Sequence, residues 1–245
     1  MTLKENEFYD INKFPKDPGI TVLGISMPSI SLKQNPRACI DATKHLISKV
    51  LTSNVGANII YTDSLYLFSD KSATSLKTKF QKLVCEHKQG YLNLIKKDLT
   101  MIPKAFTFTT WSQLILDTPL FPEYSKQFRE FYDNDPQYKK IVHDDIIRTG
   151  REISKNYINY ILEEDMLDYL LAKGLIRLQN DYVNDKEKWI LNCYHGKPRL
   201  SSIYVHQNNV FNLTNSENCY ENSFYDVEGK ILYEYDRVNL ETISL

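Results

Sequence analysis

The chain has 245 residues, of which 42% are hydrophobic and 25% are charged, and its formal net charge is −1. That length can bury a sizeable core in one large domain or two small ones. The near-zero charge gives no overall indication of a nucleic-acid binder, so any basic surface must be local. The sequence has no apolar run of the roughly 18 residues that a membrane span needs, and the polar segment 1–18 is unlike a signal peptide. We therefore expect a cytoplasmic protein that contacts neither membrane nor DNA.

Cysteine and histidine spacing gives no support for a metal site or a disulfide framework. The four cysteines are far apart and include no C-x-x-C pair, and the five histidines include no H-E-x-x-H or H-x-H arrangement. Neither a Walker A loop nor a G-x-G-x-x-G fingerprint occurs, which removes the usual sequence evidence for ATP or a dinucleotide. We therefore expect reduced cysteines, no metal and no cofactor.

The first buried strand ends close to a serine. A polar arm over residues 1–19 leads into the apolar, β-branched run Ile20–Leu23, which is followed by Gly24, Ser26 and the breaker Pro28. Ligands of open α/β sheets bind at the carboxyl ends of strands, which is where Ser26 would lie. The same stretch also fits an ordinary strand end with a tight turn, so this serine needs support from elsewhere in the chain.

The next elements predict a parallel β-α-β unit. Pro36 can open a helix over about 37–51, and the run Ala57–Tyr61 has the composition of a second buried strand. Strand, helix and strand with short connections imply a right-handed parallel arrangement. An alternating segment, Phe106–Thr110, predicts a further strand, and Trp111 follows it.

A long helix predicted over about 72–97 carries an excess of lysines. Its only acids are Glu86 and Asp98. A charge run is usually a solvated surface, but this imbalance also fits a helix face that contacts phosphates. The lysines are Lys77, Lys79, Lys82, Lys88, Lys96 and Lys97.

The second half of the chain is predicted to be helical and then to return to strands. Helices are expected over 124–132, 138–147 and 152–171. In the last of these, Tyr160 and Glu164 lie one turn apart on one face. Such a pair suits a substrate ammonium group, and it equally suits a partly buried glutamate bonded by a tyrosine. Strands are expected at 188–195, 204–210 and 230–235.

Four features together resemble the tRNA-dependent cyclodipeptide synthases: Gly24-Ile25-Ser26, the basic helix, Tyr160-x-x-x-Glu164 and Tyr194-His195. Their order and spacing carry the resemblance, which covers about residues 20–200. It implies an α/β fold, namely a Rossmann-like parallel sheet flanked by helices on both faces, similar to the catalytic domain of class I tyrosyl- and tryptophanyl-tRNA synthetases. We expect one such domain over residues 20–245, acting as a monomer on two aminoacyl-tRNAs.

The resemblance also implies roles for the site residues. Ser26 would be the nucleophile that holds the first aminoacyl group as an ester, and Tyr194 would orient its hydroxyl. Tyr160 and Glu164 would bind the amino group, and Gly24 would let the chain pass close to it. A second aminoacyl-tRNA would then give a dipeptidyl-enzyme, and ring closure would release a diketopiperazine. The lysines of the basic helix would bind acceptor-stem phosphates.

The same resemblance outlines a substrate pocket. Tyr124 matches a further family tyrosine near the site, and Trp111 would favour a small first amino acid such as Ala or Gly. This chain mixes the patterns of two branches of the family. One branch has Asn at the position of Ser29 together with a Tyr-His pair on the late strand, and the other has a different residue there together with Tyr-Pro. Here Ser29 occurs with Tyr194-His195. The wall for the first amino acid would be formed by Val22, Ile60, Trp111, Leu167 and Asn192.

Two other functions are compatible with the sequence. One is a serine hydrolase that uses Ser26, although Met27 and Pro28 leave no G-x-S-x-G motif. The other is a Rossmann module that binds tRNA or protein without catalysis, in which Ser26 is inert.

Overall fold

The computed structural model describes residues 8–9, 20–27, 30, 32–49, 57–63, 73–97, 106–176, 178, 189–208, 210–211, 221–228 and 231–234. These residues include a seven-stranded sheet with the order β1-β7-β6-β5-β2-β3-β4. The pairings from β4 through β3, β2 and β5 to β6 are all parallel, whereas β7 and β1 continue the sheet in antiparallel fashion. The strands are β1 Phe8–Tyr9, β2 Ile20–Ile25, β3 Ala57–Tyr61, β4 Phe106–Thr110, β5 Trp189–Tyr194, β6 Glu221–Asp226 and β7 Ile231–Glu234.

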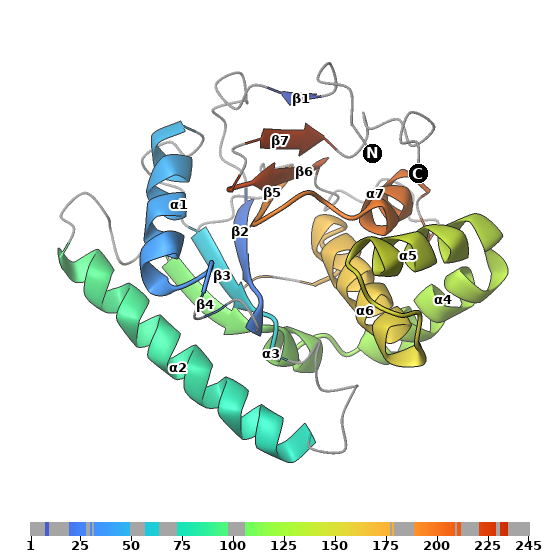
Figure 1. Ribbon diagram of the computed structural model, residues 1–245, viewed down its shortest axis with the longest axis horizontal. Coiled ribbons are helices and arrows are strands. Elements are labelled where there is room, and N and C mark those ends of the chain that lie inside the picture. Colours follow the sequence, from blue (N-terminus) through green and yellow to red (C-terminus); the bar gives the residue numbers. More distant parts are fainter. Residues whose placement is uncertain are drawn as a thin grey trace.

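Helices cover both faces of this sheet. In Figure 1, α1 and α2 lie on one side, and α4 to α7 lie on the other. The predicted α/β class, with a parallel sheet flanked by helices on both faces, is therefore confirmed. The helices are α1 Pro36–Lys49, α2 Ala73–Lys97, α3 Trp111–Leu116, α4 Phe121–Asn134, α5 Pro136–Arg148, α6 Lys155–Ala172 and α7 Leu200–Gln207.

Alternating side chains of the central strands divide the core into two clusters. Leu23 and Ile59 pack with α1 and α2, while their neighbours Val22 and Ile60 pack with α4, α6 and α7. Successive residues of a strand point to opposite faces, so a strand buried on both faces must be apolar at every position. This is why the short apolar runs at 20–23 and 57–61 could be predicted as central strands.

One predicted strand is wrong. Residues 204–207 of the predicted strand 204–210 belong to α7, because contacts with α5 fix a helix there. The backbone N–H of Ser201 donates to Asp145 Oδ2 at 2.9 Å, and the ring of Tyr204 stacks on Tyr138 with centroids 5.9 Å apart. Strand β6 was not predicted, and β1 adds Phe8 and Tyr9 from the predicted arm to the sheet edge.

Some predicted features lie outside the described residues. They are Ser29, most of the arm 1–19, and the predicted ends of the helix near 51 and of the strands near 188, 230 and 235. Among the helices that the structure does describe, none combines the length and the apolar character that a membrane span requires.

Candidate active site

The carboxyl ends of three parallel strands meet at one edge of the sheet. Ile25, Tyr61 and Thr110 lie side by side as the last residues of β2, β3 and β4. On the other side of β2, strand β5 ends at Tyr194. The edge is therefore occupied by the residues that follow these strands, namely Ser26, Thr62, Trp111 and His195.

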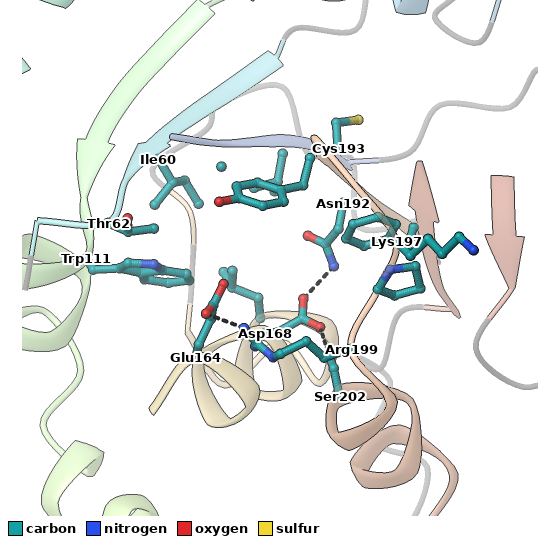
Figure 2. Close-up of a pocket in the computed structure, with 16 residues that line it drawn as sticks. Ile60, Thr62, Trp111, Glu164, Asp168, Asn192, Cys193, Lys197, Arg199 and Ser202 are labelled. Atoms are coloured by element: carbon teal, nitrogen blue, oxygen red, sulfur yellow. Dashed lines mark hydrogen bonds and ion pairs between the residues drawn. The ribbon is translucent and has the colours of Figure 1, made fainter. Parts of the chain in front are cut away.

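A pocket of about 130 Å³ opens at this edge. Figure 2 shows Trp111 and Ile60 on one side of it, Asn192 on the other, and Glu164, Asp168 and Arg199 below them. Strands β2, β3 and β5 and helix α6 all contribute to it. The sequence-predicted residues that line it are Val22, Gly24, Ile60, Trp111, Glu164, Asn192 and Tyr194.

Ser26 follows the last residue of β2, and hydrogen bonds on both sides hold the backbone at this point. The residue is 5% exposed and lies two positions beyond Gly24, which lines the pocket. Its N–H donates to Gln34 Oε1 at 2.7 Å, and Gln34 Nε2 donates to the Gly24 carbonyl at 2.8 Å. The carbonyl of Ile25 accepts from both the N–H and the hydroxyl of Thr62, at 2.9 and 3.0 Å. The serine thus occupies a fixed position after the strand.

A charged cluster forms one wall of the pocket. Helix α6 begins at the N-cap Ser154, and it presents Glu164 and Asp165 to Arg199, which follows β5. Arg199 Nη1 donates to Glu164 Oε2, while its Nη2 donates to Asp165 Oδ1 at 2.9 Å. Burial raises the pKa of Asp165 to about 6 even though the guanidinium opposes this. Burial alone would lower the pKa of Arg199, but Glu164 and Asp165 hold it well above its usual value.

A second polar network, centred on Asp168, also lines the pocket. Asp168 accepts from Asn192 Nδ2 at 2.6 Å, from the Ser202 hydroxyl at 2.8 Å and from His206 Nε2 at 3.2 Å. Burial acts to raise the pKa of Asp168, but the bonds from His206 and Ser202 hold it below its usual value. Asp168 is therefore an ionised carboxylate that fixes Asn192 at the pocket wall.

Ser26 and four other predicted site residues of the described part of the chain are not among the residues that line the pocket. Tyr160 lies one turn before Glu164 on α6 and belongs to the electrostatic environment of Arg199. Leu167 is fully buried in the core, and Tyr124 on α4 packs against Phe211 with ring centroids 5.5 Å apart. His195 follows Tyr194 and is half-buried; desolvation lowers its pKa, while the nearby carboxylates Glu228 and Asp226 act to raise it.

No family model matches the sequence, and no curated protein matches it. Solved structures do match. A CDPS from Fluoribacter dumoffii gives a TM-score of 0.59 at 12% identity, over 86% of this chain and 90% of that one. A cyclodipeptide synthase from Bacillus thermoamylovorans gives 0.52 at 16% identity, over 94% of this chain and 97% of that one. This chain has the cyclodipeptide synthase fold.

A third solved structure shares this fold. A Mycobacterium tuberculosis protein, described as demonstrating that cyclodipeptide synthetases are related to type I tRNA synthetases, gives a TM-score of 0.57 at 14% identity. The match covers 91% of this chain and 88% of that one. In this cyclodipeptide synthase fold, the candidate pocket lies at the carboxyl edge of the parallel sheet, where open α/β sheets bind ligands.

The lysines predicted to bind tRNA are all exposed on α2. Lys88 Nζ lies 5.3 Å from the ring centroid of Phe108, and Lys82 forms a 3.8 Å surface ion pair with Glu86. Within the described part of this cyclodipeptide synthase fold, no group of three or more His, Cys, Asp or Glu side chains could hold a metal.

Sequence reasoning missed Arg199, Asp168 and Thr62. Asp168 had a usable signal, since it lies one turn after Glu164 on the same helix face. Arg199 had none, because a single arginine after Pro198 belongs to no pattern. Its role is visible only where the cyclodipeptide synthase fold brings it to Glu164.

Proposed function

We propose that this protein is a cyclodipeptide synthase that forms a cyclic dipeptide from two aminoacyl-tRNAs through an aminoacyl-serine intermediate. The observation that carries the proposal is the pocket itself. Gly24, Glu164 and Tyr194 come from three distant segments, and all of them line one pocket within a cyclodipeptide synthase fold, with Ser26 two positions beyond Gly24.

In the first step, Ser26 Oγ attacks the ester carbonyl of an aminoacyl-tRNA. The aminoacyl group becomes an ester of the serine, and the tRNA leaves with its terminal hydroxyl restored. Its ester is already activated, so the enzyme needs mainly to position it, and positioning can supply roughly 7 kcal/mol or more. Gly24 lines the pocket opposite Tyr194, since a Cβ at this position would lie 3.5 Å from the tyrosine ring, an ordinary van der Waals distance.

In the second step, the amine of the bound aminoacyl group attacks the ester of a second aminoacyl-tRNA. This gives a dipeptidyl-serine and releases the second tRNA. The free amine of the new residue then attacks the serine ester, which closes the diketopiperazine ring and regenerates Ser26. Glu164, together with Tyr160 one turn away, would hold the ammonium group, and Glu164 could accept its proton when the amine attacks.

The pocket favours a small first amino acid. A cavity of 150 Å³ holds a molecule of about the size of benzene, which has six non-hydrogen atoms. The pocket here is about 130 Å³. The main-chain atoms of an aminoacyl group take most of that space, and the Trp111 indole bounds the remainder, so side chains such as those of Ala or Gly fit best.

Charged tRNAs provide the test. Purified protein incubated with pools of aminoacyl-tRNA should release cyclic dipeptides, detected by mass, and single-turnover intact mass should show an aminoacyl adduct. Ser26→Ala should lose both, whereas the control Ser125→Ala, on the exposed surface of α4, should keep both. Wild-type product formation by Ser26→Ala would rule out the covalent mechanism. Hydrolysis of the charged tRNAs without ring closure would indicate a hydrolase, and binding without turnover would indicate a non-catalytic module.

A further inference from the structure

Gln34 is a buried amide that joins the two sides of the nucleophile segment. It is 1% exposed, and its two side-chain polar atoms bond to backbone groups on either side of Ile25. Oε1 accepts from the Ser26 N–H at 2.7 Å, and Nε2 donates to the Gly24 carbonyl at 2.8 Å. An amide is the side chain that satisfies both groups at once, because it carries an acceptor and a donor. The pairing of β2 with β5 ends at Leu23, and beyond it the Gln34 side chain bonds to the backbone in place of a strand.

Gln34 is itself held from behind by groups of α1, α2 and β3. Its backbone carbonyl accepts from His87 Nε2 at 2.8 Å and from the Cys39 thiol at 3.3 Å. A carbonyl only accepts, so His87 carries its proton on Nε2, and Nδ1 accepts from the Tyr61 hydroxyl at 2.9 Å. This chain of bonds, Tyr61–His87–Gln34–Ser26, runs through the buried core under the sheet edge.

We propose that Gln34 is a positioning residue that sets the place of Ser26 for acyl transfer, with His87 and Tyr61 holding Gln34 in turn. The proposal rests on the proposed function of Ser26. The Ser26 N–H, being donated to Gln34, is unavailable to an oxyanion, so Gln34 acts through placement of the serine and not through charge stabilisation. A displacement of about 1 Å at a reacting group can cost roughly 10²-fold in rate.

Two substitutions separate positioning from a general effect on folding. Gln34→Met removes the acceptor and the donor and should slow formation of the acyl-enzyme roughly 10²-fold, with little change in KM for charged tRNA. Gln34→Glu keeps the shape and the acceptor, and it regains the donor only when its carboxyl is protonated. Its acylation rate should therefore approach that of the wild type at low pH and fall as pH rises. Gln127→Glu, on the exposed face of α4, is the matched control and should follow the wild type throughout.

The neighbours of Gln34 do not disturb this pH profile. Burial raises the pKa of Cys39 to about 12, raises that of Tyr61, and lowers that of His87, so all three stay neutral above pH 7. The measurement is the single-turnover rate of adduct formation by intact mass, from pH 7 to 9. Wild-type rates for Gln34→Met, or a wild-type pH profile for Gln34→Glu, would overturn the positioning role alone. Absence of an adduct in the wild type with every charged tRNA would instead refute the proposed function.

Discussion

The polar groups buried on the two faces of the central strands are satisfied in different ways, by neutral hydrogen bonds on one face and by ion pairs on the other. On the face covered by α1 and α2, Tyr61, His87 and Gln34 form a chain of neutral hydrogen bonds inside an apolar cluster. On the face covered by α4 to α7, Arg199 is paired with Glu164 and Asp165, which are charged groups. Both sets are largely withdrawn from water, yet only the second lies at the pocket.

The difference follows from what each face does. Neutral groups are cheaper to bury than ions, so the α1–α2 face can fix the serine backbone without paired charges. An ion pair at a pocket is costly to desolvate, but it places at the pocket the carboxylate of Glu164, which we propose binds the substrate ammonium. We therefore expect removal of a buried charge on the pocket face to reduce stability most, and removal of a neutral group on the other face to reduce it less.

Removal of the central cation should have the largest effect. Arg199→Met leaves the fully buried Asp165 without its guanidinium partner, and breaking a buried ion pair in this way costs about 3–5 kcal/mol. Burial already raises the pKa of Asp165 to about 6. Without Arg199 it should rise further, so the variant should keep losing stability as pH increases through and beyond 6, where the wild type no longer does. Urea unfolding at several pH values measures this.

Arg37→Met is the matched control on the other face. Arg37 forms an exposed ion pair with Asp41 on α1, and such pairs contribute about 0.5 kcal/mol. Equal losses for Arg37→Met and Arg199→Met would contradict the contrast between the two faces.

Glu164 and its neighbour Glu163 sharpen the comparison within one helix. Glu164→Gln removes the charge at the pocket and should lower kcat/KM for cyclic dipeptide formation by roughly 10²-fold. Glu163 does not line that pocket, and burial raises its pKa to about 8. It is therefore mostly protonated at neutral pH, and Glu163→Gln should leave turnover nearly unchanged.

The stability of the control Glu163→Gln, relative to the wild type, should depend on pH. A carboxyl with a raised pKa in the folded state stabilises it at low pH, and this contribution is lost as pH rises toward 8. Glu163→Gln should therefore become more stable than the wild type over the same interval, which thermal unfolding at pH 5 to 9 would show. A stability difference that does not change with pH would mean that Glu163 is not buried as a neutral acid.

Removal of a hydroxyl on the face covered by α1 and α2 should reduce stability less than removal of Arg199. Tyr61→Phe leaves the buried Nδ1 of His87 without a donor, and an unsatisfied buried acceptor costs about 1–3 kcal/mol. The control Tyr157→Phe is at an exposed position near the start of α6 and should be close to neutral. Chemical denaturation measures the free energy of unfolding of both variants. If Tyr61→Phe loses no more stability than Tyr157→Phe, the chain of hydrogen bonds does not stabilise that face.

How far the sequence predicts this molecule depends on the range of the interactions. Strands β2, β3 and β4 and helix α2 follow from local periodicity, because each buries residues at a regular spacing. Residues 204–207 of α7 were predicted as strand because the helix depends on contacts with α5, such as the bond to Asp145, which are distant in sequence. The same limit applies at the site: Glu164 stood out through its spacing from Tyr160, but Arg199 acquires its partners only in the folded chain.

Replacement of the exposed lysines of α2 should have the smallest effect of these substitutions. It tests whether tRNA binds to the outer side of the face covered by α1 and α2. Replacement of Lys79 and Lys82 by Glu should raise KM for charged tRNA roughly tenfold, which corresponds to about 1.4 kcal/mol, and leave folding almost unchanged because both side chains are exposed. Loss of two phosphate contacts should also reduce the slope of log KM against log salt by about 2. The control, replacement of Lys126 and Lys140 by Glu, makes the same change in charge at exposed positions of α4 and α5, across the sheet, and should change neither quantity. If both variants weaken tRNA binding equally, the effect is one of total charge, and α2 is not the surface along which the tRNA lies.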